Sequence, residues 1–263
     1  MLPFRELELR FLGRPVLGID HRRHAERVVA VALTYKGSST PSVQLVAQQS
    51  AYASRFEVDT LDYALSEAAT LESHFGRRAR TLAEQAATPA AVRTAAQSAR
   101  VLHFACHAFV DNNDPYGSLL SLSPPLETAG FVRAADVMSS WRLQADLVML
   151  AACNTNVGAL QRYEGVFGLA RAFLVAGART VGATLWQISD EATHAFAKAF
   201  YAHYAKGMAK DESLRQAQLA LRKDRRFSDP YFWSGFVIIG DYQNGVGAPA
   251  PQGRTNSPRI QKR

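Results

Sequence analysis

VLHFACH at residues 101–107 and DLVMLAAC at residues 146–153 are the stretches that decide the fold of this chain. Each starts as a short, continuous apolar run, which is typical of a strand buried on both faces of a parallel sheet. Helical patterns alternate with such runs along the chain, and this alternation predicts a mainly parallel sheet with helices on both faces. The sequence therefore predicts an α/β fold in which His107 and Cys153 each come directly after a strand.

Outward from this centre, apolar patterns and turn residues predict the remaining elements. Strands are expected at 27–35, 43–47, 179–186 and 236–239, helices at 61–75, 88–98, 165–176, 189–206 and 211–223, and a polar loop at 107–118. Three parts are expected along the chain: an N-terminal segment at 1–60 with strands of uncertain pairing, a main domain at 61–243, and a basic tail at 244–263 that is expected to be disordered.

The two candidate residues are expected to meet at one edge of the sheet. They are separated by 46 residues, which suits a crossover between parallel strands. Parallel strands present their carboxyl ends on the same side, where the working residues of such sheets collect. A nearby imidazole can take the proton of a thiol and later protonate a leaving amine. Position alone leaves open that Cys153 is a buried apolar residue and His107 a loop histidine bonded to backbone.

Composition excludes several classes of protein. The two cysteines, Cys106 and Cys153, form no disulfide framework or zinc-ligand spacing, so no metal or other cofactor is expected. Cys106 is expected to pack inward, and His103 is expected to be a core histidine with satisfied hydrogen bonds. The formal net charge is +7, but four of the basic residues lie in the last ten positions, so the rest of the chain is only weakly basic. This weak charge argues against nucleic acid as a partner. The first 26 residues contain no apolar signal segment, so the cytoplasm is expected and a membrane is not.

The chain resembles the CHAT-domain peptidases in several segments. LHFACHAFVDNNDPYGSLLSLS (102–123) is similar to their histidine segment, and DLVMLAACNTNVG (146–158) is similar to their cysteine segment. Similar blocks follow in order at 164–193, 213–223 and 229–241, and the likeness covers about residues 60–241. The resemblance implies a caspase-hemoglobinase-like three-layer sandwich, the fold of separases and related cysteine peptidases.

The resemblance also implies roles for individual residues. His107 matches the catalytic histidine and Cys153 the nucleophile, while the backbone N–H groups of Ala108 and Cys153 would form the oxyanion hole. The candidates for the substrate pocket are Trp186, Gln187, Asp190 and Glu164. Core packing for Trp186, a helix cap for Asp190 and an exposed acid for Glu164 stay open as structural alternatives.

Two positions depart from the family pattern. Ala108 and Asn156 stand where glycine is usual, and alanine does not easily adopt a positive φ. If the oxyanion donor needs that conformation, activity would fall; asparagine tolerates it better.

The resemblance implies a cysteine endopeptidase that cleaves a specific protein partner, in the setting of a bacterial defence or regulated-death pathway. No tetratricopeptide repeat is found in this chain, so a stand-alone protease or a separate regulatory chain with such repeats is expected. The alternatives are a catalytically weak caspase-like scaffold, suggested by Ala108, and a basic nucleic-acid-binding domain.

Overall fold

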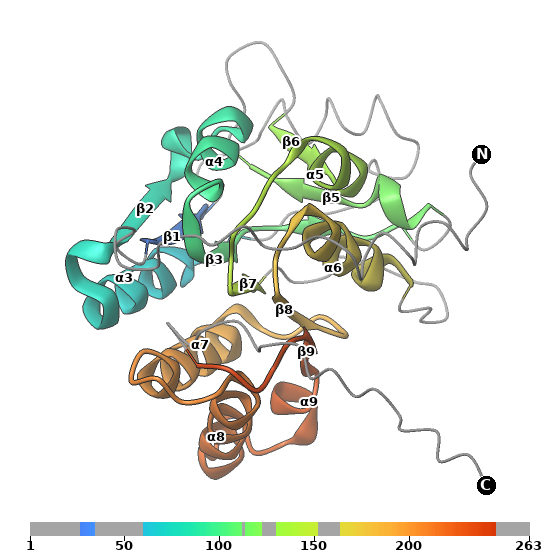
Figure 1. Cartoon of the computed structure of the whole chain (residues 1–263). Helices are drawn as coiled ribbons and strands as arrows, with labels where there is room; N and C mark the ends of the chain where they lie inside the picture. Colours follow the sequence, from blue (N-terminus) through green and yellow to red (C-terminus); the bar gives the residue numbers. More distant parts are fainter. Residues whose placement is uncertain (1–26, 35–59, 112–113, 123–129, 152–163, 246–263) are drawn as a thin grey trace, which may run out of the picture.

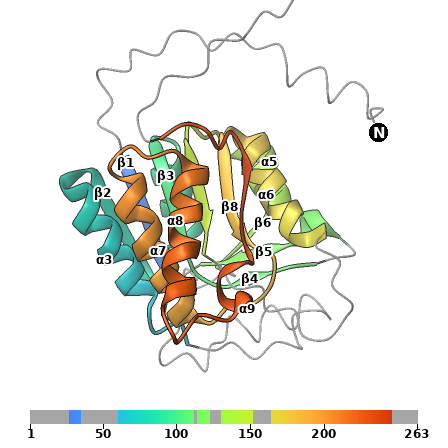
Figure 2. The same cartoon turned by 90° about the horizontal axis from the view of Figure 1, so that it is seen from below.

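A computed structural model describes residues 27–34, 60–111, 114–122, 130–151 and 164–245 of the chain (Figure 1). These residues form three layers, with a central sheet between two groups of helices (Figures 1 and 2). The predicted strand at 43–47 and the predicted disorder from residue 246 onward lie outside the described residues.

The central sheet has six described strands in the order β2-β1-β3-β7-β8-β9. Neighbouring strands are parallel except for β8 and β9, which are antiparallel. The strands are β1 (Arg27–Ala32), β2 (Ala79–Ala83), β3 (Ala99–Ala105), β7 (Leu147–Leu150), β8 (Thr180–Thr184) and β9 (Phe236–Gly240). The predicted α/β fold with a mainly parallel sheet is confirmed. The pairing of the N-terminal strand, which the sequence left open, is with β2 and β3.

One face of this sheet is covered by α3, α7 and α8 (Figure 2). These helices are α3 (Ala64–Phe75), α7 (Asp190–Tyr204) and α8 (Lys210–Lys223). Their aromatic side chains, among them Phe196, Phe200 and Tyr201, pack on the strand residues of that face. Fully burying one such apolar side chain stabilises a fold by about 1.5–3 kcal/mol.

The opposite face is covered by α4 (Pro89–Ala96), α5 (Ala134–Ser140) and α6 (Glu164–Ala176). Phe173 of α6 lies against Phe104 of β3 and Trp141, with ring centroids 5.5 and 6.0 Å apart. Because successive strand residues point to opposite faces, each buried strand contributes to both layers.

Local signals in the sequence explain where these helices begin and end. Thr88 caps α4, with its hydroxyl accepting from the N–H of Ala91 at 3.3 Å, and Ser189 caps α7 through the N–H of Ala192 at the same distance. Gly76 follows α3 with a φ of 55°, and Gly177 follows α6 with a φ of 118°, a region that favours glycine. The helices predicted at 61–75, 165–176, 189–206 and 211–223 are confirmed to within a few residues.

A second, smaller sheet joins the end of β3 and corrects one prediction. It is antiparallel, in the order β4-β5-β6, and consists of β4 (Ala108–Phe109), β5 (Leu119–Ser121) and β6 (Phe131–Arg133). The stretch 107–118, predicted as a polar loop, therefore contains β4 and the short 3-10 helix η4 (Pro115–Gly117). Strands of two or three residues are too short to show a period in the sequence.

The remaining short elements are η2 (Gly76–Arg78), η3 (Glu84–Ala86) and α9 (Pro230–Trp233). In the described part of the chain, no helix combines the length and apolar composition needed to cross a bilayer.

Candidate active site

The register of the central sheet brings the two predicted catalytic positions to the same edge. Phe104 of β3 pairs with Leu150 of β7, and the two strands are parallel neighbours. His107 and Cys153 are each three residues beyond these paired positions. Cys153 itself lies outside the described residues, so its place relative to His107 stays a prediction.

His107 lies between the central sheet and the small one. It follows β3 and directly precedes β4, and its carbonyl oxygen accepts a hydrogen bond of 2.9 Å from the N–H of Ser121 in β5. The His107 side chain is 2% exposed, and its ring lies 6.5 Å from that of Phe109. The histidine is thus fixed on both sides by strands.

Ala108 has an ordinary strand conformation. It lies in β4, opposite Leu120, and it does not have a positive φ. Hydrogen-bonded and non-hydrogen-bonded residue pairs alternate along an antiparallel ladder. Because the N–H of Ser121 bonds to the carbonyl oxygen of His107, the next pair, Ala108 and Leu120, is a non-hydrogen-bonded one. The N–H of Ala108 therefore points away from β5. Alanine at this position therefore causes no backbone strain. The loss of activity that a positive φ at Ala108 would imply does not arise in this conformation.

Trp186 and Gln187 follow the end of β8. This strand is the second from β3 in the sheet, so at normal strand spacing β8 lies about 10 Å from β3. The indole N–H of Trp186 donates to the carbonyl oxygen of Tyr231 at 2.9 Å. The Tyr231 hydroxyl in turn donates to the backbone carbonyl oxygen of Gln187 at 2.5 Å. The indole also lies against Gly235, where an added Cβ would meet it at 2.8 Å. Trp186 is half-buried and Gln187 is exposed.

Asp190, the first residue of α7, faces α3. Its carboxylate accepts a 2.8 Å hydrogen bond from the N–H of Tyr63. Desolvation by burial raises the pKa of this carboxyl, while the hydrogen bond from Tyr63 opposes the rise. Tyr63 is the residue before α3, so this bond joins the starts of α3 and α7, while Ser189 caps α7 itself.

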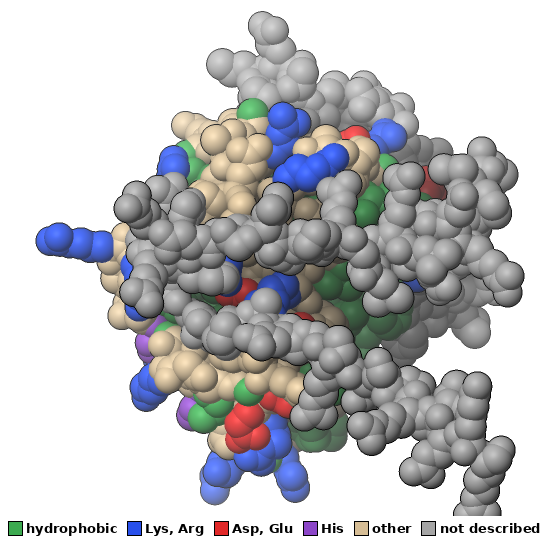
Figure 3. Space-filling model, in the orientation of Figure 1, with side chains coloured by type: hydrophobic (Ala, Val, Ile, Leu, Met, Phe, Trp, Pro, Cys, Tyr) green, Lys and Arg blue, Asp and Glu red, His purple; other side chains and the backbone are tan. Residues whose placement is uncertain are grey.

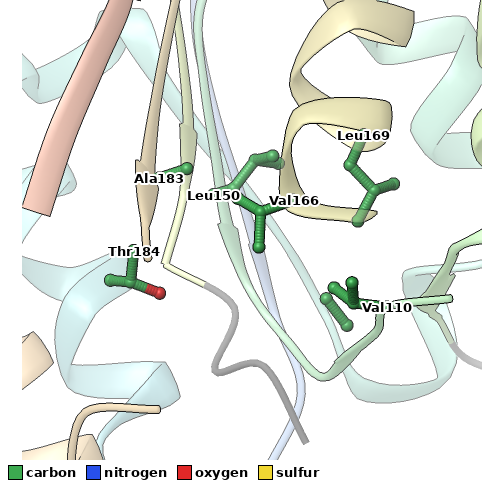
Figure 4. Close-up of a pocket in the computed structure, with 7 residues that line it drawn as sticks. Val110, Leu150, Val166, Leu169, Ala183 and Thr184 are labelled. Atoms are coloured by element: carbon green, nitrogen blue, oxygen red, sulfur yellow. The ribbon is translucent and has the colours of Figure 1, made fainter. Parts of the chain in front are cut away.

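A small cavity lies beside Ala108, between the ends of β7 and β8 and the start of α6 (Figure 4). Its volume is about 10 Å³, which leaves room for about one water molecule. Its lining residues are Ala108, Val110, Leu150, Val166, Leu169, Ala183 and Thr184. Sequence reasoning missed this cavity, because its walls come from four separate elements and are mostly ordinary aliphatic residues.

The other thiol and the strand histidine have structural environments, as predicted. Cys106 is fully buried, and its burial raises the pKa of the thiol far above the usual range. The ring of His103 is fully buried between two partners, with Nε2 2.7 Å from Glu67 Oε2 and Nδ1 3.1 Å from the Tyr201 hydroxyl.

Glu164 is the first residue of α6, and its side chain lies outside the described part of the structure. Within the described ranges, no three His, Cys, Asp or Glu residues are grouped so that they could hold a metal ion.

Comparison with known proteins agrees with this architecture. Residues 20–241 match the family model of the CHAT domain. The curated relatives include tetratricopeptide repeat protein 28 of Homo sapiens, 35% identical over 127 residues, and the same protein of Mus musculus, 35% identical over 121 residues. These matches cover 47% and 46% of this chain but only 5% of each relative.

Comparison with solved structures finds similar chains at low sequence identity. The Arg-specific cysteine proteinase gingipain R superposes with a TM-score of 0.53 and 9% identity, over 87% of this chain and 49% of that one. The separase–securin complex of Saccharomyces cerevisiae gives a TM-score of 0.47 and 11% identity, over 90% of this chain and 13% of that one. The family match covers most of the chain, and the sheet, its covering helices and the gingipain superposition agree with it: the chain belongs to the CHAT-domain family and has the caspase-like fold of cysteine proteases.

Proposed function

We propose that this chain is a cysteine endopeptidase in which Cys153 is the nucleophile and His107 the general base and acid. The observation that supports the proposal most is the pairing of Phe104 with Leu150, because both residues come three positions after directly paired residues of neighbouring strands. The Cα of Cys153 can be no further than about 11 Å from that of Leu150, the reach of three extended residues.

The proposed reaction has two stages. His107 takes the proton of the Cys153 thiol, and the thiolate attacks the carbonyl carbon of the scissile peptide bond. The negative charge on the carbonyl oxygen is stabilised by the N–H groups of Ala108 and Cys153, and His107 protonates the leaving amine as the C–N bond breaks. Water then hydrolyses the thioester, with His107 again moving the proton, and releases the acid and the free thiol.

The orientation of Ala108 supports its part in this reaction. The ladder turns the N–H of Ala108 away from β5, and the residue has an ordinary strand conformation that alanine adopts without strain. The same fact weakens the alternative of an inactive scaffold, which rested on alanine replacing glycine. In the proposed pocket, Trp186 is an apolar wall and Gln187 a polar group, while Glu164 and Asp190 shape the surrounding loops.

We propose a protein as the substrate and a separate, repeat-containing chain as the regulator. The name of the curated relatives supports this, since those much longer proteins are called tetratricopeptide repeat proteins. The family resemblance suggests a cytoplasmic role in bacterial defence or regulated death.

Charge gives nucleic acid little support as the partner. Figure 3 shows the Lys and Arg side chains dispersed over the face it draws, and at the lower edge they lie among acidic ones. Arg226, from the basic stretch RKDRR at 222–226, pairs with Asp224 and Glu191 at 2.7 Å each.

The deciding experiment compares cleavage of a peptide library prepared from whole-cell protein by wild type, Cys153→Ala and His107→Ala, with cleavage sites read by mass spectrometry. Each variant should lose at least about 1,000-fold in rate, because nucleophile and base act as a unit. Cys106→Ala is the matched control, since it removes the other thiol, and it should keep its activity. Cleavage that persists in Cys153→Ala would refute the proposal, and partner binding without any cleavage by wild type would favour the scaffold.

A further inference from the structure

Helix α6 is apolar on its outer face as well as on the face that packs on the sheet. Its sequence is EGVFGLARAFLVA, in which Glu164 and Arg171 are the only charged residues and no other side chain is polar. Helix α8, KDESLRQAQLALRK, shows the usual pattern of a surface helix, because charged and amide residues occupy the side that it turns to water. A helix that is apolar all round is normally buried all round. The outer face of α6 is therefore suited to contact with another protein.

This outer face consists of residues one helical turn apart, Phe167, Arg171 and Val175. Phe167 is 43% exposed and Val175 39%, although both side chains are large and apolar. Tyr116 of η4, which is 37% exposed, widens the face, and its hydroxyl accepts a hydrogen bond of 3.4 Å from the Arg171 guanidinium. We call these four residues the α6 surface. Grouped exposed apolar side chains of this kind mark an interaction site.

Gly168 keeps Tyr116 beside the helix. A Cβ added at Gly168 would overlap the backbone carbonyl oxygen of Pro115, so a larger residue would push η4 away from α6. The close packing of these two elements holds the α6 surface in place before any partner arrives. Binding to a preformed surface loses less conformational freedom than binding to one that must first be ordered.

Arg171 determines which partner fits the α6 surface. Among the described residues no carboxylate pairs with its guanidinium, and its hydrogen bond goes to the neutral hydroxyl of Tyr116. A partner that covered this cation with apolar atoms alone would remove its hydration without compensation, which is unfavourable. The partner must therefore bring a carboxylate to Arg171, with apolar side chains on both sides to cover Phe167 and Val175.

A second copy of the chain does not bring that carboxylate. In a two-fold pair the same surface meets itself, so each residue faces its counterpart across the axis. Arg171 lies midway between Phe167 and Val175 along the helix, and the two Arg171 groups would meet near the axis. Opposed like charges in an interface are unfavourable.

We infer that the α6 surface is the docking site for a helix of the separate regulatory chain, with an acidic residue opposite Arg171 and apolar residues one turn before and after it. An amphipathic helix presents anchors at this spacing. Tetratricopeptide repeats, for which the curated relatives are named, are built from pairs of helices. The inference rests on the proposed function, since it names the face through which the proposed regulator binds.

The test uses the full chain and, as the probe, a displayed library of helical peptides with leucine one turn before and one turn after a randomised central residue. Peptides that bind wild type should be enriched in aspartate or glutamate at the centre by about fivefold or more. Arg171→Glu should weaken the selected peptides by about tenfold or more and should bind their lysine-centred versions instead, because the two charges are exchanged. Phe167→Ser should weaken them by about tenfold as well.

Arg222→Glu is the matched control, because it makes the same change at an exposed position of α8, and it should leave every affinity unchanged. Thermal unfolding confirms that the variants fold. The inference would be overturned if no peptide were selected, if the central residue were not acidic, or if Arg171→Glu left the affinities unchanged. A chain that forms a dimer which Phe167→Ser dissociates would also overturn it, in favour of a second copy. Binding is measured in parallel on Cys153→Ala, so peptide binding by a wild type that cleaves nothing would refute the peptidase and leave the docking site standing.

Discussion

Phe104 and Leu150 are direct partners on neighbouring parallel strands, and each is followed three residues later by a group that can take part in peptide hydrolysis. The relationship joins segments that are 46 residues apart in the chain. If this register differed by one residue, His107 and Cys153 would be offset from each other along the strand direction. The predictions below test the geometry that follows from this pairing.

The backbone N–H of Ala108 is the first target. Ala108→Pro removes this N–H, and we expect it to lower kcat about 100- to 1,000-fold, the usual effect of losing one oxyanion donor. Ala108→Gly keeps the N–H and should stay within about threefold of wild type, because the residue already has a strand conformation. Rates are measured on one cleaved peptide, with circular dichroism to confirm folding; equal losses in the two variants would contradict the role of the N–H.

The two thiols are expected to react very differently with iodoacetamide. Cys106 is fully buried and its pKa is raised by desolvation, so it holds its proton at neutral pH and should stay unlabelled in the native protein. Cys153 should be labelled, and faster as the pH rises toward 8. Peptide mapping by mass spectrometry gives both rates, and unfolding in guanidinium, which should expose Cys106 to the reagent, is the control. Native labelling at Cys106 alone would contradict the assignment of the nucleophile.

Glu67 is expected to carry a pH-dependent part of the stability. Desolvation raises the pKa of this carboxyl, while the hydrogen bond and charge of His103 oppose the rise. Since the folded pKa is above the unfolded one, this contribution is complete below the unfolded pKa of about 4.3 and is lost as the pH rises through the folded value. Glu67→Gln removes the ionisable group, so its Tm should improve relative to wild type between about pH 4 and pH 7.

A matched variant separates charge from hydrogen bonding at the same position. Glu67→Leu leaves buried His103 without its 2.7 Å partner and should cost about 2–3 kcal/mol in the free energy of unfolding, whereas Glu67→Gln can still hydrogen-bond. Calorimetry across the pH range measures both. A Tm difference between Glu67→Gln and wild type that is constant with pH would contradict the raised pKa.

Tyr231 is expected to position the loop after β8 rather than to take part in chemistry. Tyr231→Phe removes only the hydroxyl that donates to Gln187, so KM should rise about 3- to 10-fold with kcat nearly unchanged. Tyr242→Phe is the control, since Tyr242 is similarly exposed and follows β9, whose end pairs with the start of β8. A fall in kcat at constant KM would contradict a positioning role.

Much of the fold could be predicted from the sequence, because local signals coincide with tertiary structure. The apolar run at 101–105 is long and buried enough to be identified as a strand, and Thr88 and Ser189 mark helix starts through their own side chains. Strand β2 was missed because it is an edge strand in which only Leu82 is buried, so its sequence has no continuous apolar run. The strands of the small sheet were missed because pairing alone defines them.

In the candidate site too, some features could be predicted from the sequence and others appear only in the structure. The position of His107 after a strand and the burial of Cys106 could be predicted, since both follow from strand ends and side-chain alternation, whereas the catalytic role of His107 stays a prediction. The contacts of Tyr231 could not be predicted, because its hydrogen bonds join α9 to the residues after β8, which no sequence spacing reveals. The hydrogen bond from the Tyr63 N–H to Asp190, across 127 residues of chain, likewise appears only in three dimensions.

The contact between Trp186 and Gly235 makes the chain its own spectroscopic reporter. The protein has three tryptophans: Trp141 is buried in the core, and the half-buried Trp233 donates its indole N–H to the carbonyl oxygen of Ser228. The Trp186 indole lies at the strand edge and is bonded to Tyr231, so a peptide that displaces either group changes its solvation and its fluorescence. Occupancy of this edge can therefore be titrated by intrinsic emission, without a dye and in a variant that has no thiol to react.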